Sequence, residues 1–332
     1  KINDIDFAID IEGDGVSRTD NNGTVIIDDR PLVDTSPLFS FYRPDIRIVG
    51  GGLRNLRIDG KGANRDCMEV RGLGWDWNIS NVQIHDFRGH ALNLNGVNDA
   101  NYDKLFIINC GSDSIEEEET PKYAINLDGG TNAQHFVSCH FEHCRYFLRE
   151  KDGFNNSFVS CKFEQSTKSI DSKNLSAPIL LYNPRQTIFD SSFFIVIGAL
   201  AYNEIGFSFE QIPYFIDTIE TDDLLLNTLT INNCSFMCGA GSDENTSKYG
   251  NEYAKYLRSN IGGIFTVNSF LNPLPCYQSI KIKGNATFND NVVITKAYGV
   301  NINGQLTPES VRGIVKPLSL DGKIVFTGNR MN

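Results

Sequence analysis

The sequence predicts an all-β fold, a single-stranded right-handed parallel β-helix in which short strands wind around one hydrophobic core. Three observations predict it: strand-like alternations recur along the chain, several end in Asn-Cys or Ser-Cys, and helical periodicity is nearly absent. A β-sandwich would also give many short strands. A recurrence of about 22 residues, however, requires like segments to stack on one another, which favours the β-helix.

The repeat is clearest in five stretches that alternate apolar and polar residues, ending at Phe87, Cys110, Cys144, Ser166 and Cys238. Alternation with a period of two turns one set of side chains inward and the other outward. The spacings between equivalent inward residues are 23, 34, 22, 31, 42 and 52 residues, so the short ones fit one coil of three strands and the long ones predict inserted loops. The residues taken as equivalent are Ile84, Ile107, Phe141, Phe163, Phe194, Phe236 and Phe288.

These spacings predict a capping segment over residues 1–45 and a β-helix over 46–332. Insertions are expected near 111–122, 196–226 and 239–262, and a short helix near 244–258. Loops that project from a rigid scaffold often carry function, so the insertions are candidate locations for site residues.

Composition excludes several classes of partner. The formal net charge of −11 argues against nucleic acid, because phosphates require a basic surface. No apolar run is long enough for insertion into a membrane. Four of the eight cysteines, Cys110, Cys139, Cys161 and Cys234, end short apolar runs, which predicts reduced thiols in the core. No dinucleotide, phosphate-loop or metalloprotease motif is present, so neither a metal nor a cofactor is expected.

The sharpest candidate site is a pair of glutamates in matching stretches, Cys-His-Phe-Glu142 and Cys-Lys-Phe-Glu164. If Phe141 and Phe163 face inward, Glu142 and Glu164 face outward at the same place on consecutive coils, ~4.8 Å apart. The acid and the nucleophile of a retaining glycosidase are separated by about this distance. Like charges so close also favour a shared proton, so both residues are candidate catalytic carboxylates.

Three neighbouring residues are candidate substrate contacts. His85 occupies the position of Glu142 two coils earlier, and Lys162 lies beside His140. The alternative is a solvated outer face on which His140, His143 and Lys162 relieve the stacked negative charge.

A second candidate cluster lies in the insertion at 196–226, where carboxylates stand among aromatic residues. Glu210 and Asp217 are its candidate catalytic acids, and Tyr202 and Tyr214 are candidate rings for stacking on sugars. Trp75 is a further candidate sugar platform, because one residue of the Trp75 and Trp77 pair is expected to face outward. The alternatives are a loop packed on the β-helix or on a neighbouring subunit, and a tryptophan that closes a coil in the core.

With these motifs the chain resembles the pectate-lyase-like right-handed β-helix superfamily, and within it bacteriophage tailspike depolymerases. The resemblance rests on Leu-Arg-Ile-Asp-Gly-Lys-Gly62, on the stretch from Val70 to Val82 and on the Asn-Cys and Ser-Cys pairs, and it covers about 45–240. It implies a homotrimer on a virion tail, outside the cell, that binds and cleaves a bacterial surface polysaccharide (capsule, O-antigen or exopolysaccharide) without a cofactor. The motifs of polygalacturonases and pectate lyases are absent; Gly89-His90-Ala91 is not a Gly-His-Gly motif.

The expected function is therefore a tailspike-type polysaccharide depolymerase that hydrolyses glycosidic bonds with paired carboxylates. Hydrolysis is favoured over β-elimination because the sequence offers no convincing set of a base and a group that neutralises a uronate. Two alternatives remain open. One is a non-catalytic glycan-binding adhesin or receptor-binding protein, and the other is a secreted polysaccharide lyase or pectinase-like enzyme.

Overall fold

The computed structural model describes residues 9–16, 23–42, 49–72, 76–112, 121–166 and 176–197. Beyond these it describes the segments 216–219, 228–232, 234–239, 266–267, 280–282, 285–289, 300–302, 305–307, 315–317 and 324–327. None of the described residues is helical, and so none belongs to a helix able to cross a membrane. The helix expected near 244–258 lies outside the described residues.

The described strands form two large parallel sheets and one antiparallel pair, β25 (Val300–Ile302) with β26 (Gln305–Thr307). Sheet A contains β1 (Asp10–Glu12), β2 (Thr24–Ile27), β4 (Gly52–Ala63), β6 (Asn78–Phe87), β8 (Asn98–Asp103), β9 (Phe106–Ile108), β11 (Asn132–Val137), β12 (His140–Glu142), β14 (Ser157–Val159), β15 (Lys162–Ser166), β17 (Arg185–Asp190), β18 (Phe193–Ile197), β20 (Thr228–Asn232), β21 (Ser235–Gly239), β22 (Thr266–Val267), β24 (Asn285–Asn289) and β28 (Ile324–Thr327). Sheet B contains β3 (Phe39–Tyr42), β5 (Met68–Arg71), β7 (Leu92–Asn95), β10 (Ile125–Asp128), β13 (Leu148–Lys151), β16 (Ile179–Tyr182), β19 (Ile216–Ile219), β23 (Ile280–Ile282) and β27 (Val315–Pro317).

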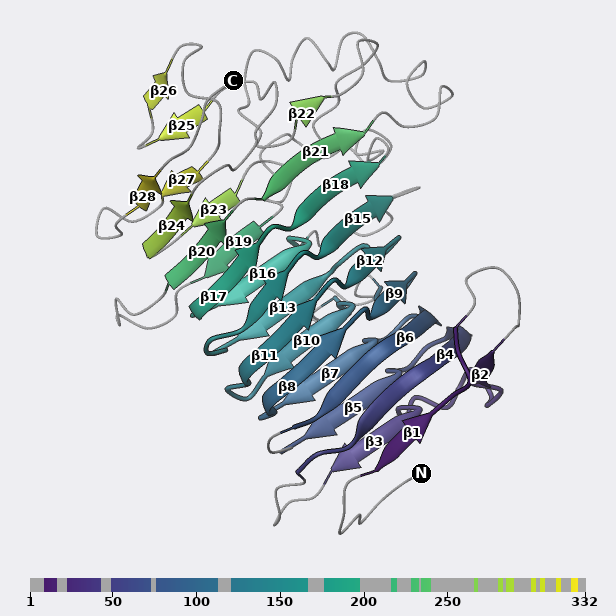
Figure 1. Ribbon diagram of the computed structural model, residues 1–332. Helices are drawn as coiled ribbons and strands as arrows, with labels where there is room; N and C mark the ends of the chain where they lie inside the picture. The colour runs from purple at the N-terminus through teal and green to yellow at the C-terminus, as the bar shows by residue number, and fades with distance from the viewer. Residues whose placement is uncertain are drawn as a thin grey trace, which may run out of the picture.

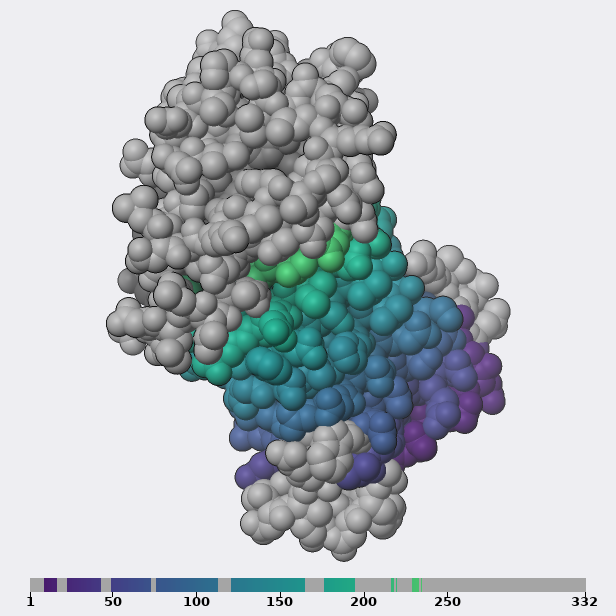
Figure 2. All heavy atoms as spheres, turned by 60° about the vertical axis from the view of Figure 1, so that its left-hand side comes forward, coloured from purple at the N-terminus to yellow at the C-terminus, as the bar shows by residue number. Residues whose placement is uncertain are grey.

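Strands of sheet A and sheet B alternate along the chain. Between consecutive strands of sheet B the chain passes through sheet A, and the second strand pairs with the first, as in β7 with β10 and β10 with β13. We call one such passage a coil. Figure 1 shows the strands stacked in chain order from the purple N-terminal end to the green strands, and Figure 2 shows the described coils in continuous contact. The arrangement is all-β, parallel and β-helix-like.

The predicted column is confirmed in register over six coils, and its five members with described side chains, Ile84 to Phe194, are buried. Ile84, Ile107, Phe141, Phe163, Phe194 and Phe236 are successive register partners in sheet A. The assignment of Phe288 to this column is wrong, because Phe288 pairs with Ile231. That pairing places Phe288 in the other half of sheet A, which precedes the bend in each coil.

Two ladders of stacked aromatic rings fill the core. Ring centroids of Phe163 lie 4.8 Å from Phe141 and 4.9 Å from Phe194. In the second ladder Phe158 lies 4.7 Å from Phe136 and 5.1 Å from Phe189. All of these rings are fully buried. Because parallel register puts like residues one above another at ~4.8 Å, the repeated Phe of the sequence becomes a continuous stack.

The Ser-Cys pairs, and Ser191-Ser192 in the equivalent place, form the bend between the two halves of sheet A. Ser138, Ser160 and Ser191 have φ values of 54°, 54° and 50°, a left-handed conformation that a short polar residue tolerates. The next residue turns inward and donates a hydrogen bond to a carbonyl of the preceding coil: Cys139 to Tyr102, Cys161 to Phe136 and Ser192 to Phe158. Six cysteines have described side chains, all of them buried and free, which confirms the prediction of core thiols for these positions: Cys67, Cys110, Cys139, Cys144, Cys161 and Cys234.

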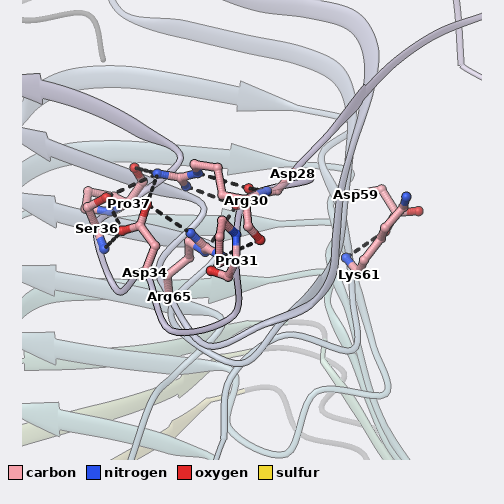
Figure 3. Close-up of polar contacts among 9 residues, drawn as sticks. All are labelled: Asp28, Arg30, Pro31, Asp34, Ser36, Pro37, Asp59, Lys61 and Arg65. Carbon is pink, nitrogen blue, oxygen red and sulfur yellow. Dashed lines mark hydrogen bonds and ion pairs between the residues drawn. The ribbon is translucent and has the colours of Figure 1, made fainter.

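The N-terminal segment is already part of the sheets. Within the expected cap at 1–45, β1 and β2 pair with β4, and β3 pairs with β5. The turn after β2 is fixed by Arg65, whose buried guanidinium lies 3.2 Å from a carboxylate oxygen of Asp28 and donates to the carbonyl of Pro31 at 2.8 Å. Figure 3 shows Arg65 enclosed by this turn, with Arg30 bridging Asp28 to Ser36.

The insertions are described only in part. An antiparallel bridge between Ser112 and Lys122 closes the base of the first one. Residues 216–219, inside the segment expected as the second insertion, form strand β19 of sheet B. The third insertion, expected at 239–262, lies outside the described residues apart from Gly239.

Candidate functional site

The outer face of sheet A carries two columns of mostly polar residues on β4, β6, β9, β12 and β15, which we call the site face. They are separated by the inward column of Ile84 and Phe141. The first column is Arg57, Gln83, Phe106, His140 and Lys162, and the second is Asp59, His85, Ile108, Glu142 and Glu164.

The predicted stacking of the two glutamates is confirmed. Glu142 on β12 and Glu164 on β15 are direct register partners, beside the buried pair Phe141 and Phe163. Partners on adjacent parallel strands lie ~4.8 Å apart. The side chain of Glu142 is 25% exposed and that of Glu164 is 11% exposed, so both carboxylates lie at the surface but largely out of water.

Basic groups alternate with the two carboxylates. His140 Nε2 lies 3.8 Å from Glu142 Oε2 and 3.6 Å from Glu164 Oε2, between the two residues. His143 Nε2 lies 3.2 Å from the other oxygen of Glu142, and the Lys162 ammonium pairs with Glu164. The chain of contacts therefore runs His143, Glu142, His140, Glu164, Lys162. It offsets the repulsion between the carboxylates, and it places an imidazole where a proton could pass to either of them.

Aromatic packing fixes the imidazole of His140. Its ring centroid lies 4.5 Å from that of Phe106, the neighbour in its own column on the preceding coil. Phe106 is 6% exposed and meets the edge of His85 at 6.4 Å. Because Phe106 is itself held, His140 is positioned by packing as well as by the two carboxylates.

His85 lies in the column of Glu142 two coils earlier, as predicted, but it is buried. Only 8% of the residue is exposed, and its Nε2 atom has no hydrogen-bond partner in the described part of the chain. Burial, assisted by the positive charge of Arg57, lowers the pKa of His85 to about 4 despite the opposing charges of Asp86 and Asp59. His85 is therefore a neutral imidazole near pH 7 that supports the site face from below the surface.

The structure does not bring Asp217 to the site face. Asp217 lies on β19 of sheet B, in register with Leu180 and Lys281, across the hydrophobic core from Glu142. The sequence predicts a loop for this segment, but Ile216 continues the inward column of Ile179 and the segment forms a strand. Trp77 is a core residue that packs against Phe41 at 5.1 Å. The other candidates, Glu210, Tyr202, Tyr214 and Trp75, lie outside the described residues.

The sequence-based prediction did not include the first two residues of the first column, Arg57 and Gln83. Arg57 and Gln83 precede Phe106 and His140 in register, and Arg57 donates to Asp59 at 2.7 Å. The signal was present, because Arg57 and Gln83 each stand one position before an inward residue, Ile58 and Ile84, and alternation with a period of two assigns both to the outer face. Among the described residues no three His, Cys, Asp or Glu side chains gather as metal ligands.

Comparisons with known proteins add one distant likeness. No family model matches the sequence, and no curated protein matches it. Among solved structures, Geobacillus virus E2 ORF18 aligns with 95% of this chain at 14% identity and a TM-score of 0.49. The aligned region is 48% of that chain, so the present sequence spans about half its length. At this TM-score the likeness establishes neither fold nor function.

Proposed function

We propose that this chain is a right-handed parallel β-helix of the tailspike type that hydrolyses glycosidic bonds of a bacterial surface polysaccharide. The observation that carries the proposal is the register pairing of Glu142 with Glu164, with His140 between them. Two carboxylates at this spacing are the minimal apparatus of a retaining glycosidase. Right-handed winding is supported by the near-universal handedness of connections between parallel strands of one sheet.

The two glutamates take different roles in this proposal. Glu164, which forms an ion pair with Lys162, is the nucleophile. Glu142 is the acid, because it faces two imidazoles, His140 and His143, through which it can exchange a proton with solvent. Glu142 protonates the leaving oxygen while Glu164 attacks the sugar carbon, and Glu142 then activates the water that releases the product.

Assembly and location belong to the same proposal. A homotrimer on a virion tail, outside the cell, is what the resemblance to tailspike depolymerases implies. The mass of the protein in solution tests the trimer directly.

The experiment is to incubate the protein with a panel of capsular polysaccharides, O-antigens and exopolysaccharides and to follow product size. Hydrolysis predicts shorter oligosaccharides with new reducing ends and no ultraviolet absorbance from an unsaturated uronate. Products that absorb in the ultraviolet would replace the hydrolase with a lyase.

A second candidate function is glycan binding without cleavage, as in an adhesin. One observation favours it: each carboxylate of the pair already contacts a basic side chain, an imidazole for Glu142 and the Lys162 ammonium for Glu164. Saturable binding of a polysaccharide whose length stays unchanged would support this second function.

A further inference from the structure

Glu150 is a carboxylate inside the hydrophobic core. It lies on β13 in register with Leu127 and Leu181, so it occupies an inward position between two leucines. None of its surface is exposed. The residues on either side of it along the strand, Arg149 and Lys151, face outward, and Glu150 forms no ion pair in the described part of the chain.

One carboxylate oxygen of Glu150 is satisfied and the other is not. Thr187 donates its hydroxyl to Oε1 at 2.7 Å. Oε2 is buried and has no hydrogen-bond partner among the described residues. Space for the carboxylate comes from Gly153, because a Cβ at that position would lie 2.3 Å from Glu150 Oε1 and 2.6 Å from Asn156 Nδ2.

The surroundings of Glu150 are polar but carry no charge. Gln134, Asn156 and Thr187 lie on three successive coils and are fully buried, and the Gln134 backbone N–H donates to Asn156 Oδ1 at 3.0 Å. The titratable member of this network is Tyr102, which donates its hydroxyl to Gln134 at 3.0 Å and is also fully buried. Neither sheet B partner of Glu150 can compensate a negative charge, since both are leucines. An ionised Glu150 would therefore be an uncompensated charge in the core.

We propose that Glu150 is a pH-sensitive stabilising group. Its neutral carboxyl stabilises the packing of the coils around β13, and its ionisation weakens that packing. This inference is independent of the proposed function, because Glu150 lies inside the core and not on the site face. Burial raises the pKa of Glu150 to about 7, and hydrogen bonding to Thr187 and Asn156 only partly offsets that effect. The folded chain thus changes charge at this position near neutral pH, whereas an unfolded glutamate does so near 4.5.

The direction of the pH effect follows from proton binding. Between 4.5 and about 7 the folded state keeps the proton that the unfolded state has lost, so stability falls as pH rises through this window. Below pH 4.5 Glu150 is protonated in both the folded and the unfolded state, and its stabilising effect is fully present. Above about 7 both are ionised and the stabilising effect is lost.

The test compares urea unfolding of the wild-type chain, Glu150→Gln and Glu150→Leu at about pH 5 and about pH 8. The wild-type unfolding constant is expected to rise by about two orders of magnitude between these conditions through this group. Both variants should lose most of that rise. Asp103→Asn, which removes an exposed carboxylate, should keep it.

A direct titration keeps the proposal testable even if neither variant folds. Carbon-13 NMR of the Glu150 carboxyl in the wild-type chain should give a midpoint near neutral pH. A midpoint near the ordinary glutamate value, or variants with the wild-type dependence on pH, would overturn the proposal.

Discussion

His140 Nε2 lies 3.6 Å from Glu164 Oε2 on the next coil and thus joins two carboxylates that the chain presents 22 residues apart. The contact exists because β12 and β15 are in register, with His140 opposite Lys162 and Glu142 opposite Glu164. The repeat that builds the core therefore also assembles the candidate site.

The first prediction concerns the aromatic core. Phe163 stacks on Phe141 and Phe194, so replacing it with alanine leaves a cavity in the ladder. Phe163→Ala should destabilise the chain by about 3–5 kcal/mol in urea unfolding. Val137→Ala on the exposed face, where Val137 is 39% exposed, should change stability by no more than about 0.5 kcal/mol. Equal effects of the two substitutions would contradict the core described here.

The second prediction concerns the N-terminal turn. Burial opposes ionisation of Asp28, but hydrogen bonds from Arg30 and the charge of Arg65 hold its pKa below the usual value. Arg65→Met removes a fully buried partner and should cost about 3–5 kcal/mol in thermal or urea unfolding. Lys61→Met removes only an exposed contact with Asp29 and is the matched control, expected to be nearly neutral.

The third prediction is an acid effect from His85. An unfolded histidine gains its proton near 6.5, but folded His85 does so only near 4, so the unfolded state binds more protons between these values. The free energy of unfolding should therefore fall by about 3 kcal/mol as the pH is lowered from 6.5 to 4. His85→Leu should remove this decline, whereas His143→Leu at a half-exposed position should not. A variant with the full wild-type decline would refute this account of His85.

The fourth prediction concerns the thiols. Burial raises the pKa of Cys67, Cys110 and Cys144, and the six cysteines whose side chains are described are free. In the native state these thiols should resist a water-soluble thiol reagent, and all six should react on unfolding without prior reduction. Release of thiols only after reduction would indicate disulfides instead.

The fold could be predicted from the sequence because the patterns that specify it are local and repeated. Alternation placed Phe141 and Phe163 inward, and the same parity placed Glu142 and Glu164 outward. It failed at Phe288, because two phenylalanine columns run through sheet A and spacing alone does not tell them apart. It also placed Asp217 in a loop, since charged residues around β19 obscured a strand that is recognised by Ile216 and Ile219.

The residues that the sequence did not reveal are polar groups whose environment is set by other coils. Alternation in Leu148–Lys151 puts Glu150 on the inward side with Leu148, but charged residues are expected in water, so hydropathy argues for the opposite. Burial of His85 likewise depends on Phe106, which comes from the following coil. Predicting such burial requires the register between coils, which only the three-dimensional structure supplies.

The most direct test of the central claim is to measure polysaccharide cleavage by Glu142→Gln and Glu164→Gln, with Glu69→Gln on sheet B as the matched control. Each site variant should lose at least about 100-fold in cleavage rate while still binding the polysaccharide, and the control should cleave like the wild type. Wild-type cleavage rates in both site variants would contradict the assignment of this carboxylate pair.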